Sequence, residues 1–208
     1  MAHHDRFDLD ARQGVRAGVL TPNRTPSATD LQTYDRNFRS SLDKSEIRVT
    51  VKEKLSEEHN MTDYDALTAQ ADALVSGVPH RISNLANVSA LIFDTLEDLN
   101  WAGFYLLEGE TLVLGPFQGK PACIEIPVSR GVCGAAVREN RSQLVPDVHA
   151  FSGHIACDSA SRSELVVPLR KEGTVFGVLD LDSPSLARFT EADREGMERL
   201  CRAIELDL

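Results

Sequence analysis

Residues 101–114 read WAGFYLLEGETLVL, and this stretch decides the class of fold. Its first half is small, apolar or aromatic, which favours a strand, and the segment EGE at 108–110 predicts a turn into a second strand at 111–114. A similar pattern recurs near the C-terminus, where residues 164–170 and 175–182 flank the turn KEGT. Two such hairpins predict a mostly antiparallel sheet.

Helices are predicted around these hairpins. Apolar residues recur three or four positions apart over residues 67–75 and again over 82–96, the second helix being expected to run to Asn100. Thr190 is expected to cap a last helix. Shorter patterns predict a strand near residues 123–127, a helix near 132–139 and a strand near 143–145. The expected fold class is therefore α+β, with a six-stranded, mostly antiparallel central sheet flanked by helices.

The first 60 residues differ from the rest of the chain. They are polar and show little sustained periodicity, so residues 1–60 are expected to form a largely disordered extension and residues 61–208 the folded domain. Residues 47–51 alternate like a short strand without an evident partner. The arginines of this arm resemble those of a transit peptide, but acidic residues stand among them. Targeting, regulation and a functional start at Met61 remain alternatives.

The composition excludes several classes of partner. With 22 basic and 32 acidic residues the formal charge is -10, the wrong sign for nucleic acid or an anionic membrane surface. No apolar run approaches the roughly 20 residues of a membrane-spanning helix. The sequence contains four cysteines with no secretory leader before them, which favours a reducing, cytoplasmic location. Thiols in that compartment indicate metal binding or redox chemistry.

Three of the cysteines form the candidate chemical site. Cys157 lies in a long loop at residues 147–158 among small and polar residues, which suits an accessible, reactive thiol. Cys123 and Cys133 lack the close C-x2–4-C spacing of structural zinc sites, so no metal is expected. Cys201, in the last helix, is interpreted as a small core residue.

The predicted strands also bring aromatic and acidic side chains to one face each. Trp101 and Tyr105 point the same way along the first strand, as do Asp180 and Asp182 along the last. A solvated outer face is the more common explanation for a lone acidic pair. The apolar neighbours of these two aspartates instead favour a cationic or hydrogen-bonding ligand.

Six segments carry a resemblance to a known family. They are NWAGFY at 100–105, GPFQGK at 115–120, GVCG at 131–134, DVHAF at 147–151, GHIACD at 153–158 and GVLDLDSP at 177–184. In this order they resemble the free methionine-R-sulfoxide reductases, a GAF-domain family. The resemblance runs from about Asp63 to the C-terminus and implies a GAF fold.

The resemblance also implies a catalytic cycle. Cys157 would attack the sulfoxide sulfur while Glu164 protonates the departing oxygen, leaving methionine and a cysteine sulfenic acid. Cys123 would resolve the sulfenic acid as a disulfide, with Cys133 as an alternative or relay thiol. Thioredoxin or a similar dithiol would then restore the thiols, so no bound cofactor is expected.

The same resemblance implies a substrate pocket for the free amino acid. Trp101 and Tyr105 would form an apolar box around the methyl and thioether groups, with Asp180 and Asp182 lining the pocket. Backbone amides near Cys157, those of Ile155 and Ala156, would face the substrate carboxylate. A homodimer formed through terminal helices is possible in such a fold.

Two other functions use the same residues. A GAF-type sensor would bind a small molecule without turning it over, and a peroxide-reducing thiol protein would form the same sulfenic acid. No effector domain is evident in the sequence, and three cysteines are expected at the pocket. Both observations favour the reductase.

Overall fold

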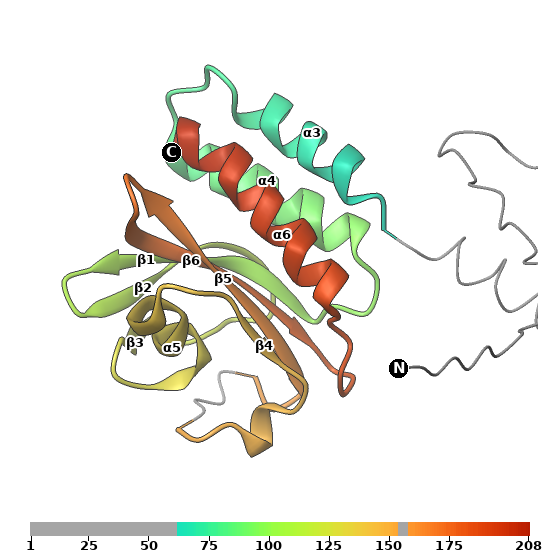
Figure 1. Ribbon diagram of the computed structural model, residues 1–208, viewed down its shortest axis with the longest axis vertical. Helices are drawn as coiled ribbons and strands as arrows, with labels where there is room; N and C mark the ends of the chain where they lie inside the picture. The colour runs from blue at the N-terminus through green and yellow to red at the C-terminus, as the bar shows by residue number, and fades with distance from the viewer. Residues whose placement is uncertain (1–61, 154–157) are drawn as a thin grey trace, which may run out of the picture. The chain divides into compact units, whose positions relative to one another are not determined.

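The computed structural model describes residues 62–153 and 158–208 (Figure 1). The expected N-terminal extension, including the strand at 47–51, lies outside these residues. The elements in chain order are α3 (Tyr64–Val75), α4 (Arg81–Thr95), β1 (Trp101–Glu108), β2 (Thr111–Gly119), β3 (Glu125–Pro127), α5 (Gly131–Glu139), β4 (Gln143–Val145), β5 (Ser163–Lys171), β6 (Thr174–Ser183) and α6 (Glu191–Ile204). Two short 3-10 helices, Val148–Ala150 and Glu205–Asp207, follow β4 and α6.

The strands form one six-stranded sheet in the order β3-β2-β1-β6-β5-β4. Both predicted hairpins, β1–β2 and β5–β6, are present, and all neighbouring strands in this sheet pair antiparallel. The α+β class and the six-stranded sheet are confirmed. Because β1 and β6 are the central neighbours, the two hairpins join into one continuous surface.

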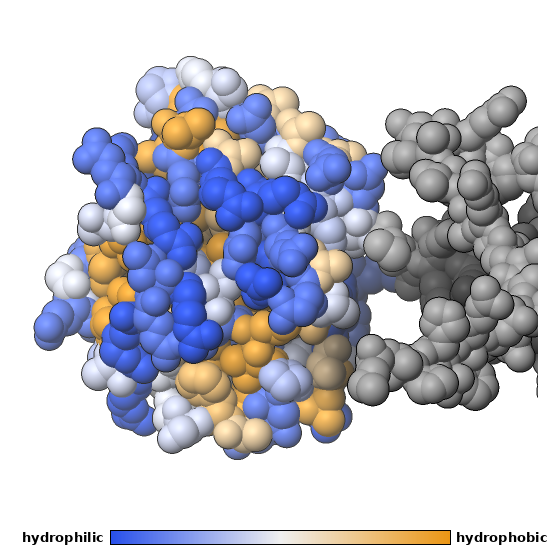
Figure 2. Space-filling model, in the orientation of Figure 1, coloured by the Kyte–Doolittle hydropathy of each residue, from blue (hydrophilic) through white to orange (hydrophobic). Residues whose placement is uncertain are grey.

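Helices cover the two faces of the sheet unequally (Figure 1). On one face α3, α4 and α6 enclose a core that includes Leu85, Phe104 and Met197, each fully buried. On the other face α5 packs over a second core that includes Trp101 and Tyr105. Neighbours along β1 thus belong to different cores, as the two-residue period of a strand requires. The outer surface in Figure 2 is dominated by hydrophilic residues.

Helix α4 ends earlier than the sequence predicts. The apolar period continues to Leu96, but the helix stops at Thr95, and Leu96 adopts an extended backbone while its side chain remains buried. Two residues later Asp98 has a positive φ of 60°, which turns the chain toward β1. The expectation that α4 runs to Asn100 is therefore wrong, because the periodic pattern includes a residue that is buried from the connecting loop.

Strand β2 is longer than predicted. It continues beyond Leu114 to Gly119, and it carries one more residue than β1 between the pairs Gly103–Phe117 and Tyr105–Leu114, which is a β-bulge in β2. The predicted cap of α6 is confirmed as a reciprocal capping box between Thr190 and Asp193. No helix among the described residues combines the length and apolar character needed to cross a membrane.

Candidate active site

The register of the three central strands aligns the predicted pocket residues in rows. Asp182 on β6 stands opposite Trp101 on β1 and opposite Glu164 on β5. One row along, Asp180 stands opposite Gly103 and Val166. Alternate residues of a strand share a face, so the predicted acids and aromatics meet on the face that α5 covers.

This acidic cluster, defined as Glu164, Asp180 and Asp182, lies in a poorly solvated setting. Glu164 and Asp180 are each only 6% exposed. Burial raises the pKa of Asp180 to about 6. Burial, followed by the negative charges of neighbouring acids, raises the pKa of Glu164 and of Asp182 well above the ordinary range. The cluster can therefore hold protons near neutral pH, as a general acid must.

Cys133 joins the acidic cluster from the first turn of α5. Its thiol donates a long hydrogen bond to Glu164 Oε1 at 3.8 Å. Burial and the negative charges of Asp180 and Glu164 raise the pKa of this thiol well above its usual value. Cys133 is therefore held as a neutral thiol rather than a reactive thiolate.

Cys133, Glu164 and Asp180 can also be considered as ligands of a metal ion. The Cys133 sulfur and one carboxylate oxygen each from Glu164 and Asp180 lie within 4.8 Å of one another. This set shares only Cys133 with the two cysteines that were considered as zinc ligands from the sequence. Asp180 Oδ1 is buried without a hydrogen-bond partner, so the acidic cluster has an acceptor available for a ligand.

An aromatic wall stands beside the acidic cluster. The ring of Trp101 stacks on Tyr105 at a centroid distance of 5.8 Å and on Phe117 of β2 at 5.3 Å. Gly103 permits this packing, because a Cβ there would collide with Phe117 and with the Trp101 ring. Sequence reasoning did not assign Phe117 to the site, although it lies in the quoted segment GPFQGK.

The polar atoms of the aromatic wall hold the segment that carries Cys123. Trp101 Nε1 donates a hydrogen bond to the Lys120 carbonyl at 3.2 Å, and the Tyr105 hydroxyl donates one to the Cys123 carbonyl at 3.1 Å. Cys123 is disulfide-bonded, whereas Cys133 and Cys201 are free. The structure thus connects the predicted substrate wall to the segment of a disulfide-bonded cysteine.

The predicted residues Ile155, Ala156 and Cys157 lie outside the described part of the chain, but both flanks of their segment are anchored. Before it, the Gly153 carbonyl accepts a hydrogen bond at 3.0 Å from the first amide of α5, at Gly131.

After it, Asp158 makes an ion pair with Lys120 at 3.6 Å and accepts a hydrogen bond from Asn100 at 3.2 Å. Asn100, Lys120 and Asp158 are supporting residues that sequence reasoning missed. Their only signal was their presence in the quoted segments.

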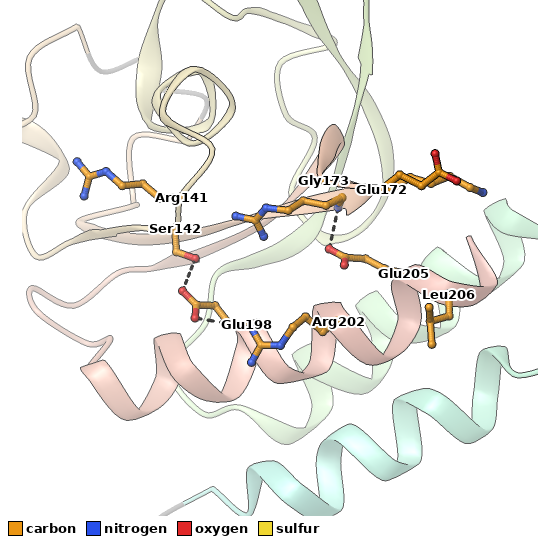
Figure 3. A pocket seen from close by; sticks show the side chains of 10 residues that line it. Arg141, Ser142, Glu172, Gly173, Glu198, Arg202, Glu205 and Leu206 are labelled. Carbon is orange, nitrogen blue, oxygen red and sulfur yellow. Dashed lines mark hydrogen bonds and ion pairs between the residues drawn. The ribbon is translucent and has the colours of Figure 1, made fainter.

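A separate surface cavity of about 700 Å³ contains none of the predicted site residues (Figure 3). Within it, Glu198 accepts a hydrogen bond from Ser142 at 2.7 Å, and Glu205 accepts one from the Arg170 amide at 2.7 Å. Its lining residues are Arg141, Ser142, Arg170, Lys171, Glu172, Gly173, Glu198, Arg202, Glu205 and Leu206. Glu198 and Glu205 are thus satisfied by local donors, unlike Asp180 Oδ1 in the acidic cluster.

Comparison with known proteins agrees with the fold. The family model described as "GAF domain" matches residues 83–206, so the chain is a GAF-domain protein. A free methionine-R-sulfoxide reductase of Escherichia coli is 53% identical over 147 residues, covering 70% of this chain and 89% of that protein. This chain therefore belongs to the free methionine-R-sulfoxide reductases, a family of oxidoreductases.

Two solved structures are similar in both sequence and shape. The fRMsr of Staphylococcus aureus in its reduced form has a TM-score of 0.69 and 52% identity, covering 72% of this chain and 97% of that one. The free methionine-R-sulfoxide reductase of Neisseria meningitidis in complex with its substrate has a TM-score of 0.67 and 42% identity, covering 69% of this chain and 87% of that one.

Proposed function

We propose that this protein reduces free methionine-R-sulfoxide to methionine by cysteine thiol chemistry. The observation that carries the proposal is the buried acidic cluster lying on the same face of the sheet as the aromatic wall, which is itself hydrogen-bonded to the segment of a disulfide-bonded cysteine. The substrate is inferred from membership of the family. The site contains groups suited to bind or react with each part of that substrate.

Substrate binding divides between the two sides of the pocket. Trp101 and Tyr105 offer the apolar surface for the methyl and thioether groups. Asp180 and Asp182 provide acceptors for the substrate ammonium group, and the backbone amides of Ile155 and Ala156 would receive its carboxylate. A pocket that binds both charged groups of an amino acid rejects methionine sulfoxide within a polypeptide, where both groups are consumed by peptide bonds.

The chemical step uses Cys157 as the nucleophile. Its thiolate attacks the sulfoxide sulfur, and Glu164 gives a proton to the oxygen, which is transferred to the cysteine as a sulfenic acid while methionine leaves. The sulfur of methionine is reduced and that of Cys157 is oxidised. The raised pKa of Glu164, caused first by burial, supports this acid role.

Cys123 is the resolving thiol in this proposal. It attacks the Cys157 sulfenic acid, forming a disulfide and releasing water. Two observations favour Cys123 over Cys133: Cys123 is disulfide-bonded, and Cys133 is a free thiol that is only 3% exposed. Cys133 then serves as a hydrogen-bond donor to Glu164 or as an auxiliary thiol.

An external dithiol closes the cycle, and we propose a thioredoxin-like protein. Such recycling requires a reducing compartment, so the proposed location is the cytoplasm. No bound cofactor takes part. A homodimer is proposed through the helical face, where Ile82 of α4 is 61% exposed.

One assay distinguishes this function from its alternatives. Free methionine-R-sulfoxide, its S epimer and hydrogen peroxide are supplied separately, with dithiothreitol or a thioredoxin system as reductant. We expect turnover of the R epimer. Binding without turnover would indicate a sensor, and preferential consumption of peroxide would indicate a peroxidase.

A further inference from the structure

An exposed isoleucine stands directly beside the disulfide-bonded cysteine. Ile124 is 72% exposed, and among the large hydrophobic residues of the described chain only Leu206, near the C-terminus, is more exposed. A single surface hydrophobic needs no explanation by itself. Ile124 differs because it adjoins the disulfide-bonded Cys123, whose sulfur a reducing thiol must reach.

The backbone holds Ile124 in this outward position. Carbonyl oxygens of the segment 120–124 accept hydrogen bonds from the interior: Lys120 from Trp101 at 3.2 Å, Cys123 from Tyr105 at 3.1 Å and Ile124 from the Leu114 amide at 2.9 Å. With three carbonyls fixed from one side, the segment presents the isoleucine as a fixed feature of the surface.

The surroundings have the composition of a small docking surface. Pro121 and Glu125 are exposed on either side of Ile124, and the Lys120 side chain is 69% exposed. Ile124 leads into β3, which is the edge strand of the sheet. An apolar anchor surrounded by polar groups is typical of residues that contribute most to protein association.

We propose that the protein dithiol that reduces the Cys123 disulfide docks on the surface around Ile124. This surface, called the Ile124 surface, consists of Pro121, Ile124 and Glu125. This inference rests on the proposed function for the origin of that disulfide. The partner is a protein whose reactive thiols emerge from an apolar surface, because such a surface buries Ile124 as its thiol approaches Cys123.

The exchange reaction at this site is balanced. The partner's first thiolate attacks the Cys123 sulfur, breaking the existing disulfide, releasing its other sulfur as a thiolate and forming a mixed disulfide. The partner's second thiol then attacks the partner's first sulfur, which is the one bonded to Cys123 in the mixed disulfide. Cys123 leaves as a thiolate, and the partner is released oxidised. Two electrons pass from the partner to the protein.

The test uses oxidised full-length protein without sulfoxide, so that it does not depend on substrate turnover. Reduction of the disulfide by reduced thioredoxin and, separately, by dithiothreitol is followed by alkylating the released thiols and measuring the mass shift. We expect Ile124→Lys to lower the second-order rate constant with thioredoxin by about tenfold and to leave the rate with dithiothreitol unchanged.

Ile124→Ser and Leu186→Lys complete the test. Ile124→Ser should show a smaller loss in the same direction, without an added charge. Leu186→Lys places the same charge at an exposed apolar position in the loop after β6 and should behave as the unsubstituted protein. An unchanged thioredoxin rate in both Ile124 variants, an equal loss with both reductants, or an equal loss in Leu186→Lys would overturn the docking proposal. Failure of the proposed function would appear elsewhere, as absence of R-sulfoxide turnover with dithiothreitol.

Discussion

The hydroxyl of Tyr105 donates a hydrogen bond to the carbonyl of Cys123 at 3.1 Å, which joins the wall of the proposed pocket to the proposed resolving thiol. Burial and nearby negative charges raise the pKa of Tyr105, so its hydroxyl remains a donor at physiological pH. The residue therefore has two roles: its ring contributes to the apolar wall, and its oxygen positions the next reactant.

We predict that Tyr105→Phe slows disulfide formation more than it slows release of methionine. The ring is retained but one hydrogen bond is lost, which corresponds to about fivefold in the ratio of the two rates. Rapid quenching during a single turnover measures methionine and disulfide separately. Equal slowing of both products would contradict the positioning role, and Phe117→Leu provides a comparison that changes the wall without touching this bond.

We expect serine variants of Cys157 and Cys123 to stop the catalytic cycle at different steps. Cys157→Ser should abolish methionine formation because the nucleophile is absent. Cys123→Ser should release one methionine per protein and then stop at the sulfenic acid. Quantifying methionine in the absence of reductant checks both, with Cys201→Ser as a buried control outside the site. Full activity of Cys157→Ser would refute its assignment.

Glu164→Gln should lower the rate of the chemical step by about 10²-fold or more and change substrate affinity less, if Glu164 supplies the proton. Since its pKa is raised, the acid form persists toward neutral pH, and the rate should decline as the pH rises through that raised value. Single-turnover rates across a pH series test this. A variant that keeps this alkaline decline would shift the acid role to Asp180 or Asp182.

The acidic cluster should also reduce stability at neutral pH. The ordinary pKa of Asp180 is 3.8 and burial raises it to about 6, so its contribution to folding is fully present below the lower value and is lost as the pH rises through the higher one. Asp180→Asn does not ionise. Relative to the unsubstituted protein, this variant should gain about 1–3 kcal/mol in free energy of unfolding between pH 4 and pH 7.5.

Urea unfolding at the two pH values measures this gain. Glu110→Gln, in the exposed turn between β1 and β2, serves as the matched control and should show little change. If Asp180→Asn gained no more than Glu110→Gln, the buried carboxyl would not carry the expected penalty.

The sequence predicted the sheet because its strands and turns are local patterns. The turns around Gly109 and Gly173 define the two hairpins, and both have the positive φ that glycine permits. The end of α4 could not be obtained in this way, since Leu96 is buried whether it belongs to the helix or to the loop. Periodicity reports burial, not the hydrogen bonds that end a helix.

In the site, too, features that follow from local sequence patterns were predicted, and features that depend on contacts between distant segments were not. Alternation along each strand predicted that Asp180 and Asp182 share a face, but their alignment with Glu164 depends on the register between β5 and β6. Phe117 was missed because its contact with Trp101 depends on the bulge in β2 and on the extension of that strand beyond Leu114. The neutral thiol of Cys133 follows from burial against acids that are distant in sequence.

Trp101 is the only tryptophan in the sequence, and it lies where the proposed reaction occurs. Its indole stacks on two aromatic rings and donates its hydrogen bond to the segment that carries Cys123. Its fluorescence should therefore respond both to occupation of the pocket and to formation of the disulfide. The protein contains an intrinsic optical probe with which binding, oxidation and recycling can be timed without any label.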